Sequence, residues 1–253
     1  MPAATQADPP KWLKQTPVAH RGLHDIARGI PENSRAAFSA AVKNGFAIEL
    51  DVRLTADGMP VVFHDAELDR LCGKPGIVSQ MTLAALKQEK LLGTEEMVPS
   101  LHDVLDLVRG AVPLLIEIKK DKGEPAGTLE AGVANLLQHY PGQVAVQSFS
   151  PRTVNWFARN APQILRGQIA SHPDSMGKDL PWHHRMILRW MLNNFYGDPA
   201  FLAYDVNDLP SPLTARYRAA GKILLSWTIR TREQRARPAA HADNVIFEEL
   251  SVQ

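Results

Sequence analysis

Short apolar runs that end in charged or ionisable side chains are the feature of this chain that most restricts its fold. Four such runs and one polar turn lie in the first half of the sequence: Pro17-Val18-Ala19-His20-Arg21, Ala47-Ile48-Glu49-Leu50-Asp51, Pro60-Val61-Val62-Phe63-His64-Asp65, Leu114-Leu115-Ile116-Glu117-Ile118-Lys119 and the turn Pro31-Glu32-Asn33-Ser34. Strands that helices cover on both faces are continuous apolar stretches. Polar residues gathered at the C-terminal ends of such strands are typical of a parallel barrel with its active site at that edge.

Eight runs have the length and apolar character of buried parallel strands: Pro17–His20, Ala47–Val52, Leu114–Lys119, Val144–Phe149, Arg166–Ala170, Phe201–Val206, Ile223–Ile229 and Asn244–Phe247. Between them, Asn, Ser or Thr caps predict helices over Ser34–Asn44, Leu83–Lys90, Leu101–Val108 and Leu129–His139. Strands that alternate with helices favour a parallel sheet. We therefore expect an α/β fold, a (β/α)8 TIM-type barrel that forms a single domain over residues 1–253.

A ninth extended run, Pro60–His64, does not belong to this count. Only Arg53 to Met59 separate it from the second strand, which is too short for a parallel crossover but sufficient for an antiparallel turn. The sequence Ala56-Asp57-Gly58 supplies suitable turn residues. We expect this run to fold back on the extension of the second strand, followed by a small insertion over about residues 65–99.

Composition argues against several classes of protein. The 28 Lys and Arg residues balance 27 Asp and Glu, which does not indicate a nucleic-acid-binding surface. Cys72 is the single cysteine, so no intrachain disulfide can form. The first ten residues lack the features of a secretory signal, and no apolar run is long enough to span a bilayer. We expect a cytoplasmic protein that acts on a small molecule, and the sequence gives no oligomeric state.

The segment of residues 182–196 combines tryptophan, methionine and leucine with two arginines, and it precedes the sixth predicted strand. Such a composition is compatible with peripheral contact to a membrane interface. We favour the simpler interpretation of a crossover helix buried against the barrel, because every parallel crossover needs a connection of this kind.

Three carboxylates stand near the ends of neighbouring predicted strands. Glu49 and Asp51 are two residues apart, so their side chains share one face of a strand, and Glu117 ends the next barrel strand. Like charges inside a barrel are costly unless a cation compensates them. Carboxylate oxygens suit a hard divalent cation such as Mg²⁺ or Ca²⁺. The alternative is a set of rim salt bridges, for example of Glu117 with Lys119 or Arg53, but the three acids together favour a metal site.

Two histidines, His20 and His64, each end an apolar run beside this carboxylate cluster. A pair of histidines near a metal can divide the work of general acid and general base. Arg21 directly follows His20, and a guanidinium is well shaped to hold a phosphate. Glu32 either orients Arg21 or the metal ligands, or begins a helix. We interpret the neighbouring Asn33 as a helix cap.

An ordered set of motifs resembles the glycerophosphodiester phosphodiesterase family. The motifs are His20-Arg21-Gly22, Pro31-Glu32-Asn33-Ser34, Glu49-Leu50-Asp51-Val52, the run from Thr55 to Asp65, Leu68-Asp69-Arg70, Pro99-Ser100-Leu101, Glu117-Ile118-Lys119, Ser148-Phe149 and Trp227-Thr228. Their order and spacing hold from about Val18 to Thr228, which is most of the chain. Each motif is weakly specific alone, whereas the ordered set is highly specific.

The resemblance implies a TIM-type barrel that hydrolyses glycerophosphodiesters to glycerol 3-phosphate and an alcohol. It implies the following roles: cation ligands Glu49, Asp51 and Glu117, acid–base histidines His20 and His64, and phosphate-binding residues Arg21 and Lys119. Two aromatic residues at strand ends, Phe149 and Trp227, either stack against the substrate's glycerol or head group or belong to the core.

The chain departs from the family pattern near its C-terminus. Members usually end with an Asp-Gly pair and a Thr-Asp before a proline, where this chain has Asp243 to Glu248. Arg230 replaces the asparagine that usually follows Trp-Thr-Val. We expect these changes at the rim of the eighth strand to affect substrate preference rather than the metal site.

Two other functions remain alternatives on the sequence. One is phospholipase D-type hydrolysis of lysophospholipids or related lipid phosphodiesters, as in secreted toxins that resemble this family. The lone cysteine and the lack of a signal peptide argue against export of this chain. The other is a non-catalytic barrel that binds phosphate esters. It would be expected to lack a metal ligand or a histidine, and none is missing from the motifs.

Overall fold

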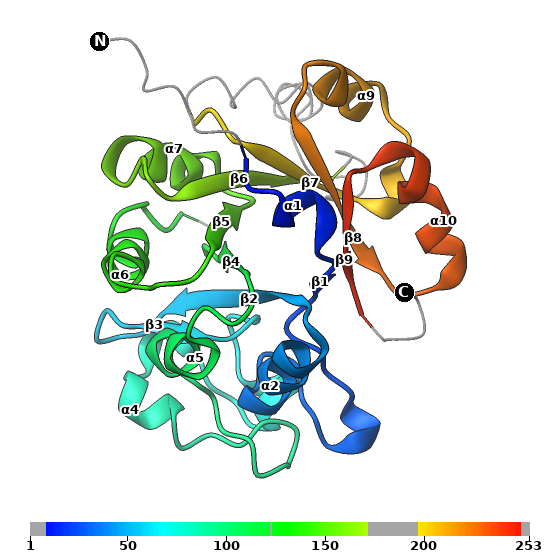
Figure 1. Ribbon diagram of the computed structural model, residues 1–253. Helices are drawn as coiled ribbons and strands as arrows, with labels where there is room; N and C mark the ends of the chain where they lie inside the picture. Colours follow the sequence, from blue (N-terminus) through cyan, green and yellow to red (C-terminus); the bar gives the residue numbers. More distant parts are fainter. Residues whose placement is uncertain (1–8, 122, 172–196, 249–253) are drawn as a thin grey trace.

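The computed structural model describes residues 9–121, 123–171 and 197–248. Within them, eight parallel strands form a ring: β1 (Val18–Ala19), β2 (Ala47–Leu54), β4 (Leu114–Ile118), β5 (Val144–Ser148), β6 (Leu165–Ala170), β7 (Phe201–Asp205), β8 (Ile223–Ile229) and β9 (Asn244–Phe247). Strand β1 pairs with both β9 and β2, which closes the barrel. Figure 1 shows the ring of strands with helices around it. The predicted (β/α)8 TIM-type fold is confirmed.

In the described part of the chain, helices cover the outside of the barrel, apart from the first, which packs into the barrel core, and two short ones in the insertion. The α-helices are α1 (Trp12–Gln15), α2 (Arg35–Asn44), α3 (Asp69–Cys72), α4 (Leu83–Leu86), α5 (Leu101–Val108), α6 (Thr128–Leu137), α7 (Pro151–Asn160), α9 (Pro212–Ala219) and α10 (Arg232–His241). The described residues also form short 3-10 helices: η1 (Ile26–Arg28), η2 (Val78–Gln80) and η4 (Val206–Asp208). Side-chain caps fix several helix starts, since the Ser34 hydroxyl accepts a hydrogen bond from the backbone at α2, and Ser100 and Asp103 form a reciprocal capping box at α5.

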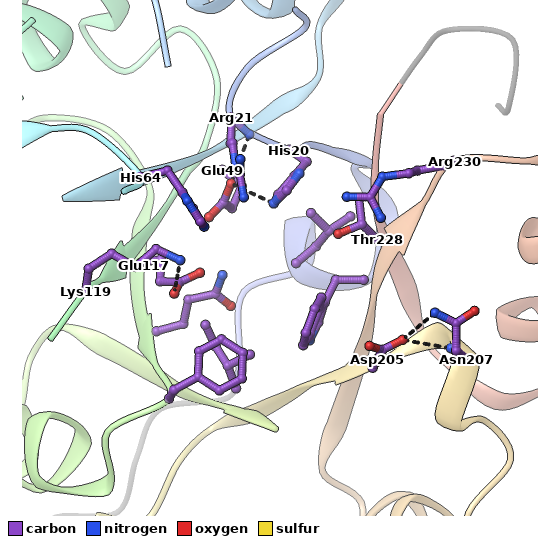
Figure 2. Close-up of a pocket in the computed structure, with 15 residues that line it drawn as sticks. His20, Arg21, Glu49, His64, Glu117, Lys119, Asp205, Asn207, Thr228 and Arg230 are labelled. Carbon is purple, nitrogen blue, oxygen red and sulfur yellow. Dashed lines mark hydrogen bonds and ion pairs between the residues drawn. The ribbon is translucent and has the colours of Figure 1, made fainter. Parts of the chain in front are cut away.

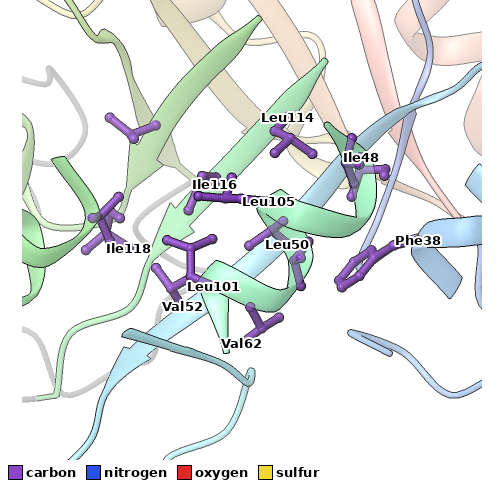
Figure 3. Close-up of a cluster of buried hydrophobic side chains, with 14 of the residues drawn as sticks. Phe38, Ile48, Leu50, Val52, Val62, Leu101, Leu105, Leu114, Ile116 and Ile118 are labelled. Atoms are coloured by element: carbon purple, nitrogen blue, oxygen red, sulfur yellow. The ribbon is translucent and has the colours of Figure 1, made fainter. Parts of the chain in front are cut away.

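Side chains along the strands alternate between two apolar layers. The outer layer lies between strands and helices, and Figure 3 shows Phe38 of α2 and Leu101 and Leu105 of α5 over β2 and β4. The inner layer fills the barrel together with Trp12 and Leu13 of α1: Val18, Ala47, Leu115, Ala145, Phe201, Ile223, Leu225 and Ile246. The barrel interior is therefore a packed core, and polar side chains gather at the C-terminal ends of the strands.

The predicted antiparallel return is present as β3 (Pro60–Val62), which pairs with the end of β2 outside the ring. After it, the backbone N–H of Phe63 donates to the carbonyl of Asp51, which places His64 over the end of β2. The insertion that follows has an apolar core of its own: Val61, Phe63, Leu68, Leu71, Val78, Leu86, Leu91 and Val98.

Two sequence expectations concern this periphery. The helix predicted over Leu83–Lys90 ends at Leu86, because the following backbone turns to pair with residues near Val98 instead of continuing as a helix. Residues 182–196, considered for peripheral membrane contact, lie outside the described residues. Among the residues that are described, no helix has both the length and the hydropathy to cross a membrane.

Candidate active site

The three carboxylates proposed as cation ligands lie together at the C-terminal end of the barrel. Asp51 of β2 and Glu117 of β4 are neighbours in the parallel register, and Glu49 lies two residues earlier on the same face of β2. One carboxylate oxygen from each residue lies within 4.8 Å of the other two. All three side chains are buried. The grouping expected from the strand-end pattern is therefore present.

Two cationic side chains lie against these acids. The Nζ of Lys119 is 2.5 Å from Oε1 of Glu117 and 3.1 Å from Oδ1 of Asp51. The Nε of Arg21 is 3.3 Å from Oδ2 of Asp51, and the Arg21 backbone N–H donates to Oε2 of Glu49 over 2.9 Å. Three carboxylates against two cations leave negative charge uncompensated in the cluster.

The turn after β1 determines where Arg21 lies. Arg21 has a φ of 55°, in the left-handed region, and Gly22 follows with a φ of 79°. A Cβ on Gly22 would lie 2.9 Å from the backbone carbonyl carbon of Ala37, so this turn packs against α2 more closely than a side chain allows. The same turn directs the N–H of Arg21 at the carboxylate of Glu49.

Burial and charge act in opposite directions on the acids. Burial raises the pKa of Glu49, and Asp51 and Glu117 raise it further. Burial also raises the pKa of Glu117, against the opposing effect of Lys119. For Asp51, Lys119 and Arg21 outweigh burial, and the pKa is lowered. The two cations thus stabilise ionised Asp51, while Glu49 lacks sufficient positive charge nearby.

The cluster fits a hard divalent cation. Oε1 of Glu49 is buried and accepts no hydrogen bond in the described part of the structure, which is unusual for a buried carboxylate. A divalent cation would satisfy this oxygen, and carboxylate oxygens are the ligands that Mg²⁺ and Ca²⁺ prefer. Of the salt bridges considered as the alternative, Glu117 with Lys119 is present, whereas Arg53 pairs with Asp121.

His20 is held by a carboxylate from the far end of the chain. Its Nδ1 lies 2.6 Å from Oε1 of Glu248, the residue after β9. Arg230, after β8, donates two hydrogen bonds to the same carboxylate, over 2.7 and 3.0 Å. Burial lowers the pKa of His20 to about 4, against the opposing effect of Glu248. At pH 7 the ring is therefore neutral, with its proton on Nδ1 facing the carboxylate and an unprotonated Nε2 3.9 Å from Oε2 of Glu49.

His64 has the same kind of support from the opposite side of the cluster. Its Nδ1 lies 2.6 Å from Oδ1 of Asp65, whose other oxygen accepts a 2.7 Å hydrogen bond from Arg70. Arg70 also donates two hydrogen bonds to Glu32, which accepts a further one from Arg21 over 2.6 Å. Burial lowers the pKa of His64. Of the two interpretations of Glu32, the structure shows the contact that orients Arg21.

Asn33 corrects one interpretation of the sequence, because it does not cap the helix. Ser34 caps α2 instead. Asn33 is buried with a φ of 53°, and its Nδ2 donates to Oδ2 of Asp51 over 2.9 Å. Its Oδ1 accepts the backbone N–H of the same aspartate over 3.3 Å. The left-handed backbone turns this amide toward the barrel, where it fixes the position of Asp51.

A cavity of about 300 Å³ opens at the carboxylate cluster. Figure 2 shows His20 and His64 on either side of Glu49, with Asp205 across the cavity. The aromatic residues that were predicted at strand ends line this cavity and meet edge to face, with ring centroids 5.7 Å apart: Phe149 and Trp227. The remaining lining residues are Arg21, Glu117, Lys119, Gln147, Ile169, Asn207, Thr228, Arg230 and Ile246. The cavity therefore joins a charged wall to an aromatic one.

Comparison with known proteins identifies the family. The glycerophosphoryl diester phosphodiesterase family matches residues 20–252. The chain belongs to this family. A glycerophosphodiester phosphodiesterase of Caldanaerobacter subterraneus subsp. tengcongensis is 29% identical over 250 residues, which cover 94% of this chain and 95% of the relative. Glycerophosphodiester phosphodiesterase 1 of Homo sapiens is 26% identical, over 88% of this chain and 74% of its own.

Solved structures agree on the fold. A phosphodiesterase of Oleispira antarctica, determined in complex with the product sn-glycerol-3-phosphate, superposes with a TM-score of 0.77 over 92% of both chains at 23% identity. Both the resemblance inferred from the motifs and the expectation of a phosphoric diester hydrolase are confirmed by the family match and the relatives.

Several residues at the site were not assigned roles from the sequence. Asp65 and Arg70 lie within motifs of the resemblance, and a carboxylate directly after a histidine was a local signal for Asp65. Glu248 and Arg230 were noted only as departures from the family; Glu248 contacts His20, and Arg230 in turn donates to Glu248. The neutral side chain of Gln147 carried no signal among the apolar residues of its strand.

Proposed function

We propose that this enzyme hydrolyses glycerophosphodiesters to glycerol 3-phosphate and an alcohol, with a divalent cation held by Glu49, Asp51 and Glu117. One observation carries the proposal: two carboxylate-supported histidines lie on either side of a buried three-carboxylate cluster that shares a cavity with two cations. The names of the relatives and the product bound to the Oleispira antarctica phosphodiesterase support the substrate class.

The charged wall of the cavity supplies phosphate binding. Arg21 is held from behind by Glu32, and Lys119 by Glu117, so both cations are oriented before substrate arrives. When bound at the carboxylates, a divalent cation supplies Lewis-acid polarisation of a phosphoryl oxygen. Arg21 and Lys119 add hydrogen-bond donors that stabilise the charge developing on the phosphoryl oxygens in the transition state.

The histidines divide the proton transfers between them. His20 is neutral and is the more buried of the two, so its unprotonated Nε2 takes the proton of the attacking hydroxyl as the general base. His64 is the more exposed of the two and can exchange protons with solvent, so it delivers a proton to the departing alkoxide as the general acid. Glu248 and Asp65 fix the orientation of the two rings.

The test is the release of glycerol 3-phosphate from glycerophosphocholine, with and without EDTA. We expect turnover that EDTA abolishes and that added Mg²⁺ or Ca²⁺ restores. The variants His20→Ala and His64→Ala should lose turnover while they keep the wild-type circular dichroism spectrum and melting temperature. Hydrolysis of acylated substrates alone would favour the phospholipase D-type alternative. Absence of turnover on every glycerophosphodiester would favour a non-catalytic barrel.

A further inference from the structure

A fourth polar side chain extends the row of carboxylates across the mouth of the barrel. Gln147 of β5 lies beside Glu117 in the parallel register, as Glu117 lies beside Asp51. Side chains in register on neighbouring parallel strands project from the same face of the sheet. Gln147 therefore points inward with the acids, and it lines the cavity with an exposed fraction of only 3%.

The carboxamide oxygen of Gln147 has no partner within the described residues. It is buried and accepts no hydrogen bond, and leaving a buried acceptor unpaired is destabilising. The carboxamide oxygen of Gln168 on the next strand is also buried without a partner, but Gln168 does not line the cavity, and its amide donates to the carbonyls of Ser148, Phe149 and Ile169. Gln147 differs from that structural glutamine because it lines the substrate cavity.

The polar row ends at Gln147. The next position in the register is Gly167, and the ring of Phe201 occupies the space that a side chain there would need, since a Cβ would lie 2.1 Å from it. Beyond this point Ile169 and Ile246 are among the residues that line the cavity. Gln147 thus stands between the charged residues around the carboxylate cluster, which suit phosphate, and a part of the cavity where apolar side chains mix with Asp205 and Asn207, which suits an uncharged group with hydroxyls.

The aromatic wall presents a second unpaired polar atom. The indole Nε1 of Trp227 is buried and donates to no acceptor in the described residues, and the residue lines the same cavity. An N–H donor cannot bind a cation, whereas a hydroxyl group both donates and accepts. An acceptor and a donor without partners in one cavity therefore match a ligand that carries free hydroxyls.

We propose that Gln147 is a substrate-binding residue whose carboxamide oxygen accepts a hydrogen bond from a free hydroxyl of the glycerol moiety, with the N–H of Trp227 donating to that moiety from the opposite wall. This inference rests on the proposed function. It assigns different residues to the two ends of the substrate. The charged wall binds the phosphate, and Gln147 makes the enzyme prefer a glycerol moiety over an alkyl chain without hydroxyls.

The test compares two ligands that differ only in hydroxyls, sn-glycerol 3-phosphate and propyl phosphate. Their dissociation constants are measured by titration calorimetry at saturating Mg²⁺, so the result does not depend on turnover. The wild-type enzyme should bind glycerol 3-phosphate more tightly, and Gln147→Met should lower this preference about five- to tenfold. Propyl phosphate affinity and Mg²⁺ affinity should stay within about twofold of wild type.

Two further variants separate binding from folding. Gln168→Met removes an equally buried carboxamide that does not line the cavity, so it should lower the melting temperature and keep the ligand preference. Gln147→Asn withdraws the carboxamide by one methylene and should lose the preference as Gln147→Met does. The assignment is overturned if both Gln147 variants keep the wild-type preference, if the wild type shows none, or if the variants weaken Mg²⁺ binding instead. If the wild-type enzyme hydrolyses glycerophosphodiesters but the Gln147 variants keep the preference for glycerol 3-phosphate, only the role of Gln147 is overturned and the proposed function stands.

Discussion

The contact between His20 and Glu248 is the part of the site whose contribution to catalysis can be tested most sharply. Glu248→Gln keeps the length of the side chain and one acceptor oxygen, but it removes the charge that faces Nδ1 at 2.6 Å. Hydrogen bonds to charged groups are worth about 1.5–3 kcal/mol, against about 0.5–1.5 kcal/mol for neutral pairs. The substitution therefore removes about 1–2 kcal/mol of support for the imidazolium that forms when His20 accepts a proton.

Glu248 stabilises the imidazolium form of His20, which exists only once the proton has been transferred. The substitution should therefore lower kcat and leave KM nearly unchanged. A difference of about 1–2 kcal/mol corresponds to a kcat that is about five- to thirtyfold lower, with KM within about twofold of wild type. The assay is continuous release of glycerol 3-phosphate from glycerophosphocholine at saturating divalent cation. Arg230→Gln leaves the carboxylate in place but removes its two hydrogen bonds, so its effect should have the same direction and be smaller.

A matched control is Glu233→Gln, because Glu233 is an exposed acid in the first turn of α10 whose role is local to that helix. It should leave kcat and KM unchanged. The reasoning about Glu248 is refuted if Glu248→Gln retains a kcat within twofold of wild type. A loss that appears only in KM would place Glu248 in substrate binding rather than in support of the base.

Three further changes test the cation site, a capping box and the core. Glu117→Gln removes one of three clustered carboxylates and should weaken Mg²⁺ binding at least about tenfold in a calorimetric titration; unchanged affinity would exclude Glu117 as a ligand. Against the opposing effect of burial, hydrogen bonds from Lys87 and Ser100 lower the pKa of Asp103 to about 2, so its stabilisation is complete above about pH 4 and lost as the pH falls through 2. Because Asp103 is partly exposed, Asp103→Asn should lower the free energy of unfolding in urea by about 1 kcal/mol at pH 7 and by almost nothing near pH 2, and a pH-independent difference would contradict this account. Phe38→Ala deletes a fully buried ring of the outer apolar layer and should lower the free energy of unfolding by about 3–5 kcal/mol in the same assay, whereas a loss below 1 kcal/mol would show that the surrounding layer collapses onto the space.

The barrel was predictable because its strands are buried on both faces. Runs such as Leu114–Ile118 are apolar at every position except the one that enters the site, so their number and order could be read from the sequence. The return at β3 was predictable from the length of its connection. The end of α4 was not, because a hydrogen-bonded return from Glu89 to Val98, made by the tertiary structure, overrides the local helical pattern.

The candidate site likewise contains residues that could be predicted from the sequence and residues that could not. Glu49, Asp51 and Glu117 were predictable because a strand ties side-chain direction to sequence spacing. Asn33 was not, because its direction depends on a left-handed backbone conformation that a preference for capping does not reveal. Gln147 was hidden for a third reason: an uncharged polar residue in a strand has no marked pattern until the register places it beside Glu117.

The two histidines differ in how their supporting carboxylates reach them, and this difference links the proposed acid–base chemistry to closure of the barrel. Asp65 follows His64 directly, so that contact is local in sequence. Glu248 is 228 residues from His20 and reaches it only when β9 pairs with β1, where the N–H of His20 donates to the carbonyl of Phe247 over 2.8 Å. Strand β9 therefore closes the barrel and orients His20, the proposed general base, in one step. A chain that stopped before β9 would retain the three clustered carboxylates and both histidines, and it would still lack the carboxylate that orients His20.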